Sequence, residues 1–225
     1  MFAVDHAATA LLIKRRFPSV SLAPILLSVQ AMEFAWVGLN YLGIERTTTE
    51  AWVRSVADIH LTYMPFSHSV ATAVGGALLA WLFVERGLGR PLIARAIGIG
   101  IVSHLVLDLL THAPDIALWP GSTLPALGLG LYDRAPMWGF ALEMVYGVIC
   151  WAVYRGSWPL LAFIALGNLA NLTFFSATIP GPERYLAGRP LTLVTVVLVQ
   201  IIAALVLIHV LAMRPAPNET ALEPA

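Results

Sequence analysis

The chain has 225 residues, of which 59% are apolar and only 12% are charged, and its formal net charge is zero. Soluble domains carry about 25% charged residues, so this composition predicts an integral membrane protein. The zero net charge excludes recruitment of nucleic acid by a basic field. The single cysteine, Cys150, excludes an internal disulfide and a cysteine-based zinc site.

Stretches of about 20 apolar residues are long enough to cross a bilayer as helices. We therefore predict an all-α integral membrane helical bundle of about six transmembrane helices, preceded by a short N-terminal helix over Val4–Ile13. The predicted spans are Leu22–Ile44, Phe66–Val84, Leu92–Thr111, Ala135–Tyr154, Pro159–Ala177 and Leu191–Met213. We expect one transmembrane domain over residues 1–214 and a disordered C-terminal tail over residues 215–225.

The distribution of lysine and arginine predicts the orientation, because cytoplasmic loops are enriched in these residues. One side of the predicted bundle collects Lys14, Arg15, Arg16, Arg86, Arg90, Arg95, Arg155 and Arg214. The other side collects Arg46, Arg54, Arg134, Arg184 and Arg189. The first side is the more basic, so we expect it to be cytoplasmic, with both termini on it.

An acidic residue and two histidines share one face of the predicted third span. His104, Asp108 and His112 follow one another at intervals of four residues, which places them on one side of a helix. Ionisable groups at membrane depth are costly and usually mark function. Imidazole nitrogens and carboxylate oxygens are also ligands that zinc and related cations accept. The alternative for His104 is a structural hydrogen bond to a neighbouring helix.

Other ionisable residues are predicted at a similar depth. His68 begins the second span, Glu33 lies within the first, and Glu143 lies two turns into the fourth, while His6 precedes the basic cluster by about two helical turns. Structural polar residues need not share one depth in the membrane, so the similar depth of these residues predicts a single site. The alternatives are a capping role for His68 and, for Glu33 and Glu143, neutral carboxyl groups bonded to a neighbouring helix.

These residues fall into a recognisable order. With His6, Ser67-His68-Ser69 and His104-x-x-x-Asp108 in sequence, the chain resembles the bacterial membrane-bound metal-dependent hydrolases, also described as LexA-regulated inner-membrane hydrolases. The resemblance covers roughly residues 1–155, and the family is distantly similar to zinc-dependent phospholipase C and the P1-type nucleases. The family usually has aspartate where this chain has Glu33, and many members have histidine where it has Tyr63.

The resemblance implies a multi-pass protein of the inner (cytoplasmic) membrane with a divalent metal, zinc being favoured by the imidazole content. It places the metal on His6, His68, His104 and Asp108, and His112 is a further candidate ligand. Glu33 would complete the ligand set or act as general base, and Glu143 would orient a ligand. The expected reaction is hydrolysis of a phosphoester or lipid-like substrate by water activated at the metal.

Two other functions remain open from the sequence. The same residues could relay protons or bind a cation in a transporter without hydrolase activity, or hold a structural metal in a non-catalytic scaffold. The long linkers Glu45–Pro65 and Ala113–Arg134 flank the spans that carry His68 and His104. We expect them to roof the site and admit an amphipathic substrate. The predicted entrance residues are Asp58, His60, Tyr63 and Asp115.

Overall fold

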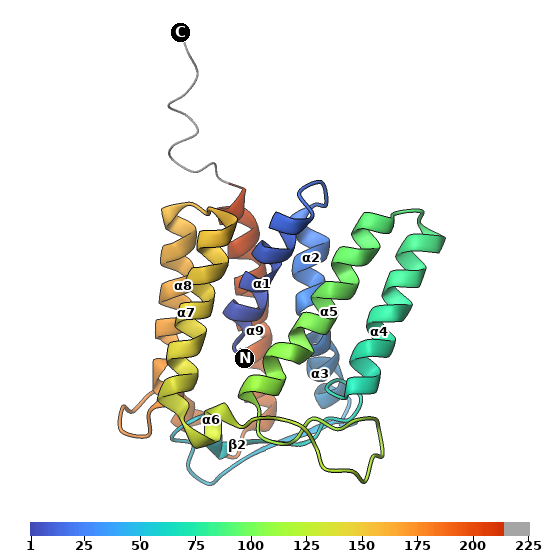
Figure 1. Ribbon diagram of the computed structural model, residues 1–225. Coiled ribbons are helices and arrows are strands. Elements are labelled where there is room, and N and C mark those ends of the chain that lie inside the picture. The colour runs from blue at the N-terminus through green and yellow to red at the C-terminus, as the bar shows by residue number, and fades with distance from the viewer. Residues whose placement is uncertain (214–225) are drawn as a thin grey trace.

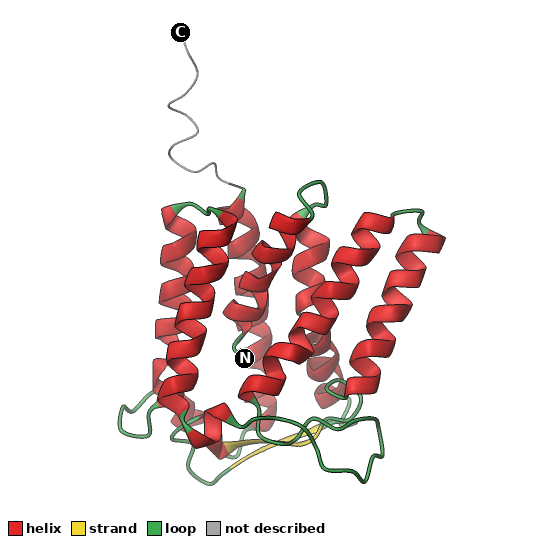
Figure 2. Ribbon diagram, in the orientation of Figure 1, coloured by secondary structure: helices red, strands yellow, loops and turns green. Residues whose placement is uncertain are grey.

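Helices running side by side dominate the computed structural model, which describes residues 1–213 (Figures 1 and 2). The predicted disordered tail, residues 215–225, lies outside the described residues. The helices are α1 (Ala3–Arg16), α2 (Leu22–Val29), α3 (Ala31–Tyr41), α4 (Val70–Leu82), α5 (Pro91–Thr111), α6 (Leu131–Arg134), α7 (Pro136–Tyr154), α8 (Trp158–Ala170) and α9 (Pro190–Ala212). The predicted helical class is therefore confirmed.

The prediction of six spans is wrong. Among the described residues, the helices long and apolar enough to cross a membrane are Val70–Gly87, Pro91–Thr111, Pro136–Tyr154 and Pro190–Ala212, four in all. A fifth is obtained if α2 and α3, which are bent by 51° relative to each other, count as one span. The predicted span Pro159–Ala177 contains only the 13-residue α8 and a 3-10 turn, Leu172–Phe175. At 1.5 Å per residue α8 covers about 20 Å of a hydrocarbon core of about 30 Å.

The N-terminal helix α1 lies in the middle of the bundle (Figure 1). It contacts α2, α5, α7, α8 and α9, and Ala7, Ala8, Ala10 and Leu11 are fully buried. The small alanine side chains let the surrounding helices approach α1 closely. The helix starts near the middle of the bundle and ends at the basic cluster Lys14-Arg15-Arg16, so its first turn is deep inside the molecule (Figure 1).

The two ends of the bundle differ. Short turns join α1 to α2, α4 to α5 and α7 to α8 at one end, and long segments cover the other (Figures 1 and 2). The linker Glu45–Pro65 contains a small antiparallel sheet, which the all-α prediction missed. Its strands are β1 (Arg46–Thr49) and β2 (Ile59–Tyr63), with Arg46 opposite Tyr63 and Thr48 opposite His60. Threonine, isoleucine and tyrosine are common in strands, and this hairpin returns the chain to the start of α4.

Candidate metal centre

The structure brings His6 of α1, His68 of the turn before α4, and His104 and Asp108 of α5 together. All four side chains are buried. Asp108 is the common neighbour: its Oδ1 lies 3.1 Å from His6 Nε2, and its Oδ2 lies 3.0 Å from His104 Nε2 and 3.6 Å from His68 Nε2. The Met1 amine also lies 2.7 Å from Asp108 Oδ1. We call His6, His68, His104 and Asp108 the histidine cluster.

Several atoms that face one another in the histidine cluster lack hydrogen-bond partners. Among the described residues, His68 Nε2, His104 Nε2 and Asp108 Oδ2 are buried and have none. A buried polar atom without a partner costs about 1–3 kcal/mol, and such atoms are rare in native proteins. Two sets, His6–His104–Asp108 and Glu33–His68–His104, each have ligand atoms within 4.8 Å of one another. One cation among these atoms would satisfy several of them.

The break between α2 and α3 orients His104. Gln30 at the break has φ −113° and ψ 7°, so the helix does not continue through it. The Val29 carbonyl accepts the hydrogen bond from His104 Nδ1 at 2.7 Å. Close packing of α2 on α5 makes this possible, because a Cβ on Gly100 would lie 2.9 Å from Ser28 Cβ. With Nδ1 donating to a carbonyl, His104 presents the lone pair of Nε2 to the cluster.

A chain of hydrogen bonds through Glu45 and Ser67 orients His68 in the same way. Glu45 is not among the site residues predicted from the sequence. The buried Glu45 accepts from the Phe66 and Ser67 backbone N–H groups at 2.8 Å each. The Ser67 hydroxyl donates to Glu45 Oε2 at 2.6 Å and lies 2.8 Å from His68 Nδ1. Because Ser67 donates to Glu45, it accepts from His68 Nδ1, and His68 Nε2 is left free to bind a cation.

Of the other predicted ligands, His6 lies inside the cluster and His112 and Glu33 lie at its edge. The His6 ring stacks on the His104 ring, with 3.8 Å between the ring centroids. His112 Nε2 lies 3.7 Å from Asp108 Oδ1, and its Nδ1 lies 3.3 Å from Asp115 Oδ1. Glu33 Oε1 lies 3.9 Å from His104 Nε2. His112 and Glu33 therefore border the cluster, while His6 is packed within it.

Glu143 lies in a different polar environment. Its Oε1 accepts the Phe2 backbone N–H at 3.1 Å and the Tyr132 hydroxyl. Its carboxyl also faces that of Asp5, which in turn accepts from Asn168 Nδ2 at 3.3 Å. Among residues 1–213, Glu143 makes no hydrogen bond or ion pair with the imidazoles of the cluster; its hydrogen-bond partners there are Phe2 and Tyr132. No such bond therefore supports the expectation that it orients a metal ligand.

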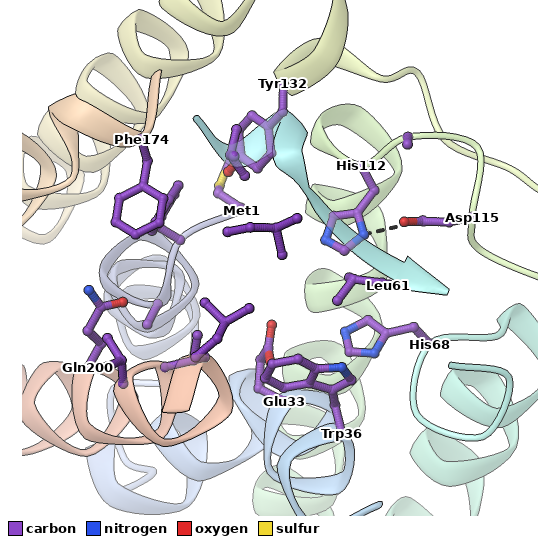
Figure 3. Close-up of a pocket in the computed structure, with 18 of the residues that line it drawn as sticks. Met1, Glu33, Trp36, Leu61, His68, His112, Asp115, Tyr132, Phe174 and Gln200 are labelled. Carbon is purple, nitrogen blue, oxygen red and sulfur yellow. Dashed lines mark hydrogen bonds and ion pairs between the residues drawn. The ribbon is translucent and has the colours of Figure 1, made fainter. Parts of the chain in front are cut away.

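A cavity of about 160 Å³ adjoins the histidine cluster on the side of the long loops. In Figure 3, Glu33, Trp36, His68 and His112 lie on one side of it and Phe174 and Gln200 on the other. Both long linkers contribute to its wall, with Val56, Ile59 and Leu61 from the first and Ala113, Asp115, Tyr132 and Asp133 from the second.

Of the four predicted entrance residues, Asp115 alone lines this cavity. Asp58 accepts from the backbone of Arg54 and Ser55, His60 pairs with Glu50, and Tyr63 packs against Phe66. Asp133 is a further acidic residue on the wall, and partial burial, followed by the nearby Asp115 carboxylate, raises the pKa of Asp133.

Comparison of the chain with protein-family models, with curated proteins and with solved structures found no match. The features that bear on function are those of the site itself: a buried set of imidazole and carboxylate atoms, oriented by their hydrogen-bond partners, next to a cavity.

Proposed function

We propose that the protein is a membrane-embedded, divalent-metal-dependent hydrolase that acts on a phosphoester or lipid-like substrate. One observation carries the proposal. His68 Nε2, His104 Nε2 and Asp108 Oδ2 converge inside the bundle, unpartnered within the described chain, beside a cavity that reaches the loops. Structural polar residues would pair with one another instead of leaving several unpartnered atoms at one point.

The residues present fit a divalent metal, and their chemistry favours zinc. Neutral imidazole nitrogens and a carboxylate oxygen form a typical zinc ligand set. His104 and His68 have their Nδ1 atoms engaged by the Val29 carbonyl and by Ser67, which is the usual arrangement behind a ligating imidazole. His6, His68, His104 and Asp108 would hold the metal, with His112 at the margin. Such a metal supplies Lewis acidity and lowers the pKa of a water that it binds.

The protein's own groups would position the reaction. Glu33 lines the cavity and lies 3.9 Å from His104, so its carboxylate can accept a proton from water in the cavity. Asp115 holds the ring of His112 from the loop side. The apolar bundle around the cluster keeps bulk water away, which strengthens electrostatic interactions inside the site.

A cation transporter is the second candidate function, and one observation favours it. The break between α2 and α3 lies beside the cluster, and broken helices are common at the binding sites of transporters. Uptake of divalent cations into liposomes that contain the purified protein would support this alternative. Hydrolysis without cation flux would support the hydrolase.

The first test is the metal content of the purified protein. We expect about one or more divalent ions per chain, and a preparation without stoichiometric metal would contradict the proposal.

The second test is Glu33→Gln, which we expect to lower phosphodiester hydrolysis by about 100-fold or more while the protein still folds. Unchanged metal content and unchanged activity would return Glu33 to a structural role.

We further propose that the end of the bundle with the short turns faces the cytoplasm. Lys14, Arg15 and Arg16 end α1 there, and Arg155 caps α7 at the same end. Single cysteines at Thr48 and Gly87 should therefore label from opposite sides of the membrane. Thr48 belongs to the hairpin at the end with the long segments, and Gly87 lies in the turn between α4 and α5 at the other end (Figure 1). The native Cys150 is buried and serves as an internal background control.

A further inference from the structure

The cavity beside the histidine cluster extends well past the candidate ligands, and its far wall is apolar. Phe2, Phe174, Leu193 and Val197 form this wall. The Phe2 and Phe174 rings pack edge to face with their centroids 5.6 Å apart. Figure 3 shows Phe174 separated from His68 and Glu33 by the open space of the cavity. A small polar substrate would not need this wall, whereas an apolar chain would bury surface against it.

The apolar wall continues to the outer surface of α9. Leu193, Val197 and Gln200 face the cavity, and Thr192, Thr195, Val196 and Val199 form an exposed stripe on α9. Val196 belongs to both sets, since it lines the cavity and is 37% exposed. It lies six residues after Pro190, or about 9 Å along a helix that can span the bilayer. The cavity therefore reaches the lipid-facing surface at a depth where acyl chains lie.

A buried donor on the cavity wall has no acceptor. Trp36 is 4% exposed and lines the cavity, and its indole Nε1 has no hydrogen-bond partner within residues 1–213. Figure 3 places Trp36 beside Glu33 and His68. Buried tryptophan N–H groups usually find an acceptor, so this one fits an oxygen of a bound molecule, such as an ester carbonyl or a phosphate oxygen.

The charge of the cavity wall restricts the polar end of that molecule. Its formally charged side chains are Glu33, Asp115 and Asp133, and no lysine or arginine is among the described residues that line it. Asp115 and Asp133 come from the loop segment, at the end of the cavity away from the membrane interior. Acidic groups there disfavour an anionic head and favour a zwitterionic one whose ammonium group lies beside them.

We propose that this cavity binds an amphiphile with an apolar chain that enters past Val196, an oxygen that accepts from Trp36, and a zwitterionic head beside Asp115 and Asp133. The amphiphile would be the substrate of the proposed hydrolase. Its hydrolysis depends on that proposed function, whereas its binding in the cavity does not.

The test is photolabelling of the full-length protein in vesicles of neutral lipid. The probe is a lysophosphatidylethanolamine with a diazirine in its acyl chain, and the matched probe has an anionic phosphoglycerol head on the same chain. We expect the first probe to label peptides that contain Leu193–Val197 and Val56–Leu61 with at least about threefold higher apparent affinity than the second. Equal labelling by both heads would overturn the head-group assignment.

Matched variants locate the binding site. Val196→Trp should weaken labelling about tenfold or more by filling the opening, while Val199→Trp, on the same exposed stripe, should not. Trp36→Phe keeps the ring but removes the N–H, and should weaken binding about threefold to tenfold. Its control is Trp138→Phe, since Trp138 is 74% exposed.

Labelling that is unchanged in Val196→Trp, or confined to the exposed stripe of α9, would overturn the binding site. Labelling of the cavity without turnover would support the amphiphile site and count against the hydrolase. Turnover without labelling of the cavity would support the hydrolase and count against the amphiphile site. The two proposals can therefore fail separately.

Discussion

Adjacent residues of α1 enter two different polar clusters. His6 points to α5 and joins the histidine cluster, whereas Asp5 points to α7 and α8 and joins Glu143 and Asn168, which we call the carboxyl cluster. Successive residues on a helix are rotated by about 100°, so neighbours in sequence face different partners. Both clusters are buried and ionisable, but the first surrounds a carboxylate with imidazoles and the second contains two carboxyl groups.

The difference lies in the kinds of ligand atom that converge. In the carboxyl cluster, donors from Asn168, Tyr132 and the Phe2 backbone reach one oxygen of each carboxyl group, and Asp5 Oδ2 and Glu143 Oε2 have no partner among the described residues. In the histidine cluster, the Nδ1 atoms of His68 and His104 are engaged from behind, and their Nε2 atoms face Asp108 without a donor between them. Unpartnered buried oxygens therefore do not by themselves identify a metal site. Among the described residues, three or more ligand side chains converge at the histidine cluster and not at the carboxyl cluster.

The largest effect should come from Asp108→Asn. Asp108 contacts each imidazole of the histidine cluster, so the loss of its charge should remove stoichiometric metal from the purified protein, with affinity lowered by more than about 100-fold. Elemental analysis after size-exclusion chromatography measures this. The control is Asp133→Asn, on the loop side of the cavity. Full metal occupancy in Asp108→Asn would place the metal elsewhere in the protein.

Removal of metal by a chelator should destabilise the wild-type protein. Binding of the folded state at 100 times Kd contributes about 2.7 kcal/mol, so thermal unfolding should shift downward when the ion is withdrawn and return when zinc is added. Asp108→Asn should show no such shift. If chelation lowered the stability of both proteins equally, the effect would not come from the histidine cluster.

Glu45→Gln tests the hydrogen bonds behind His68. The amide keeps the size of the side chain but lacks the charge that accepts from Ser67 and two backbone N–H groups, so we expect metal affinity to fall by about 10–100-fold. Glu50→Gln is the matched control, because Glu50 is exposed and pairs with His60 in the hairpin. Equal metal affinities in the two variants would reduce Glu45 to a loop anchor.

The smallest effect on metal should come from the carboxyl cluster. Glu143→Ala leaves the Phe2 N–H and the Tyr132 hydroxyl without their acceptor, which should cost about 1–3 kcal/mol in unfolding free energy while metal content stays unchanged. Glu143→Gln retains an acceptor oxygen and should recover most of that stability. Metal loss in Glu143→Gln would assign Glu143 to the metal centre after all.

Much of the site follows from local spacing. The interval of four residues places His104 and Asp108 on one helix face whatever the surrounding fold, and the shared depth of His6 and His68 is a consequence of where the apolar segments begin. Glu143 shows the limit of the depth argument. It lies at a suitable depth, but its side chain meets Tyr132 and Phe2, and depth carries no information on the direction in which a helix face points.

The sequence by itself determined the apolar helices, the single helix face of His104 and Asp108, and the basic segment at the end of α1, because these depend on composition and on the helical period alone. The tertiary structure decided the remainder. The 51° bend at Gln30 that exposes the Val29 carbonyl, the hairpin that brings Glu45 to Ser67, and the central position of α1 are contacts between segments far apart in the chain. Such contacts depend on packing that no local pattern records, and they orient the imidazoles of the histidine cluster.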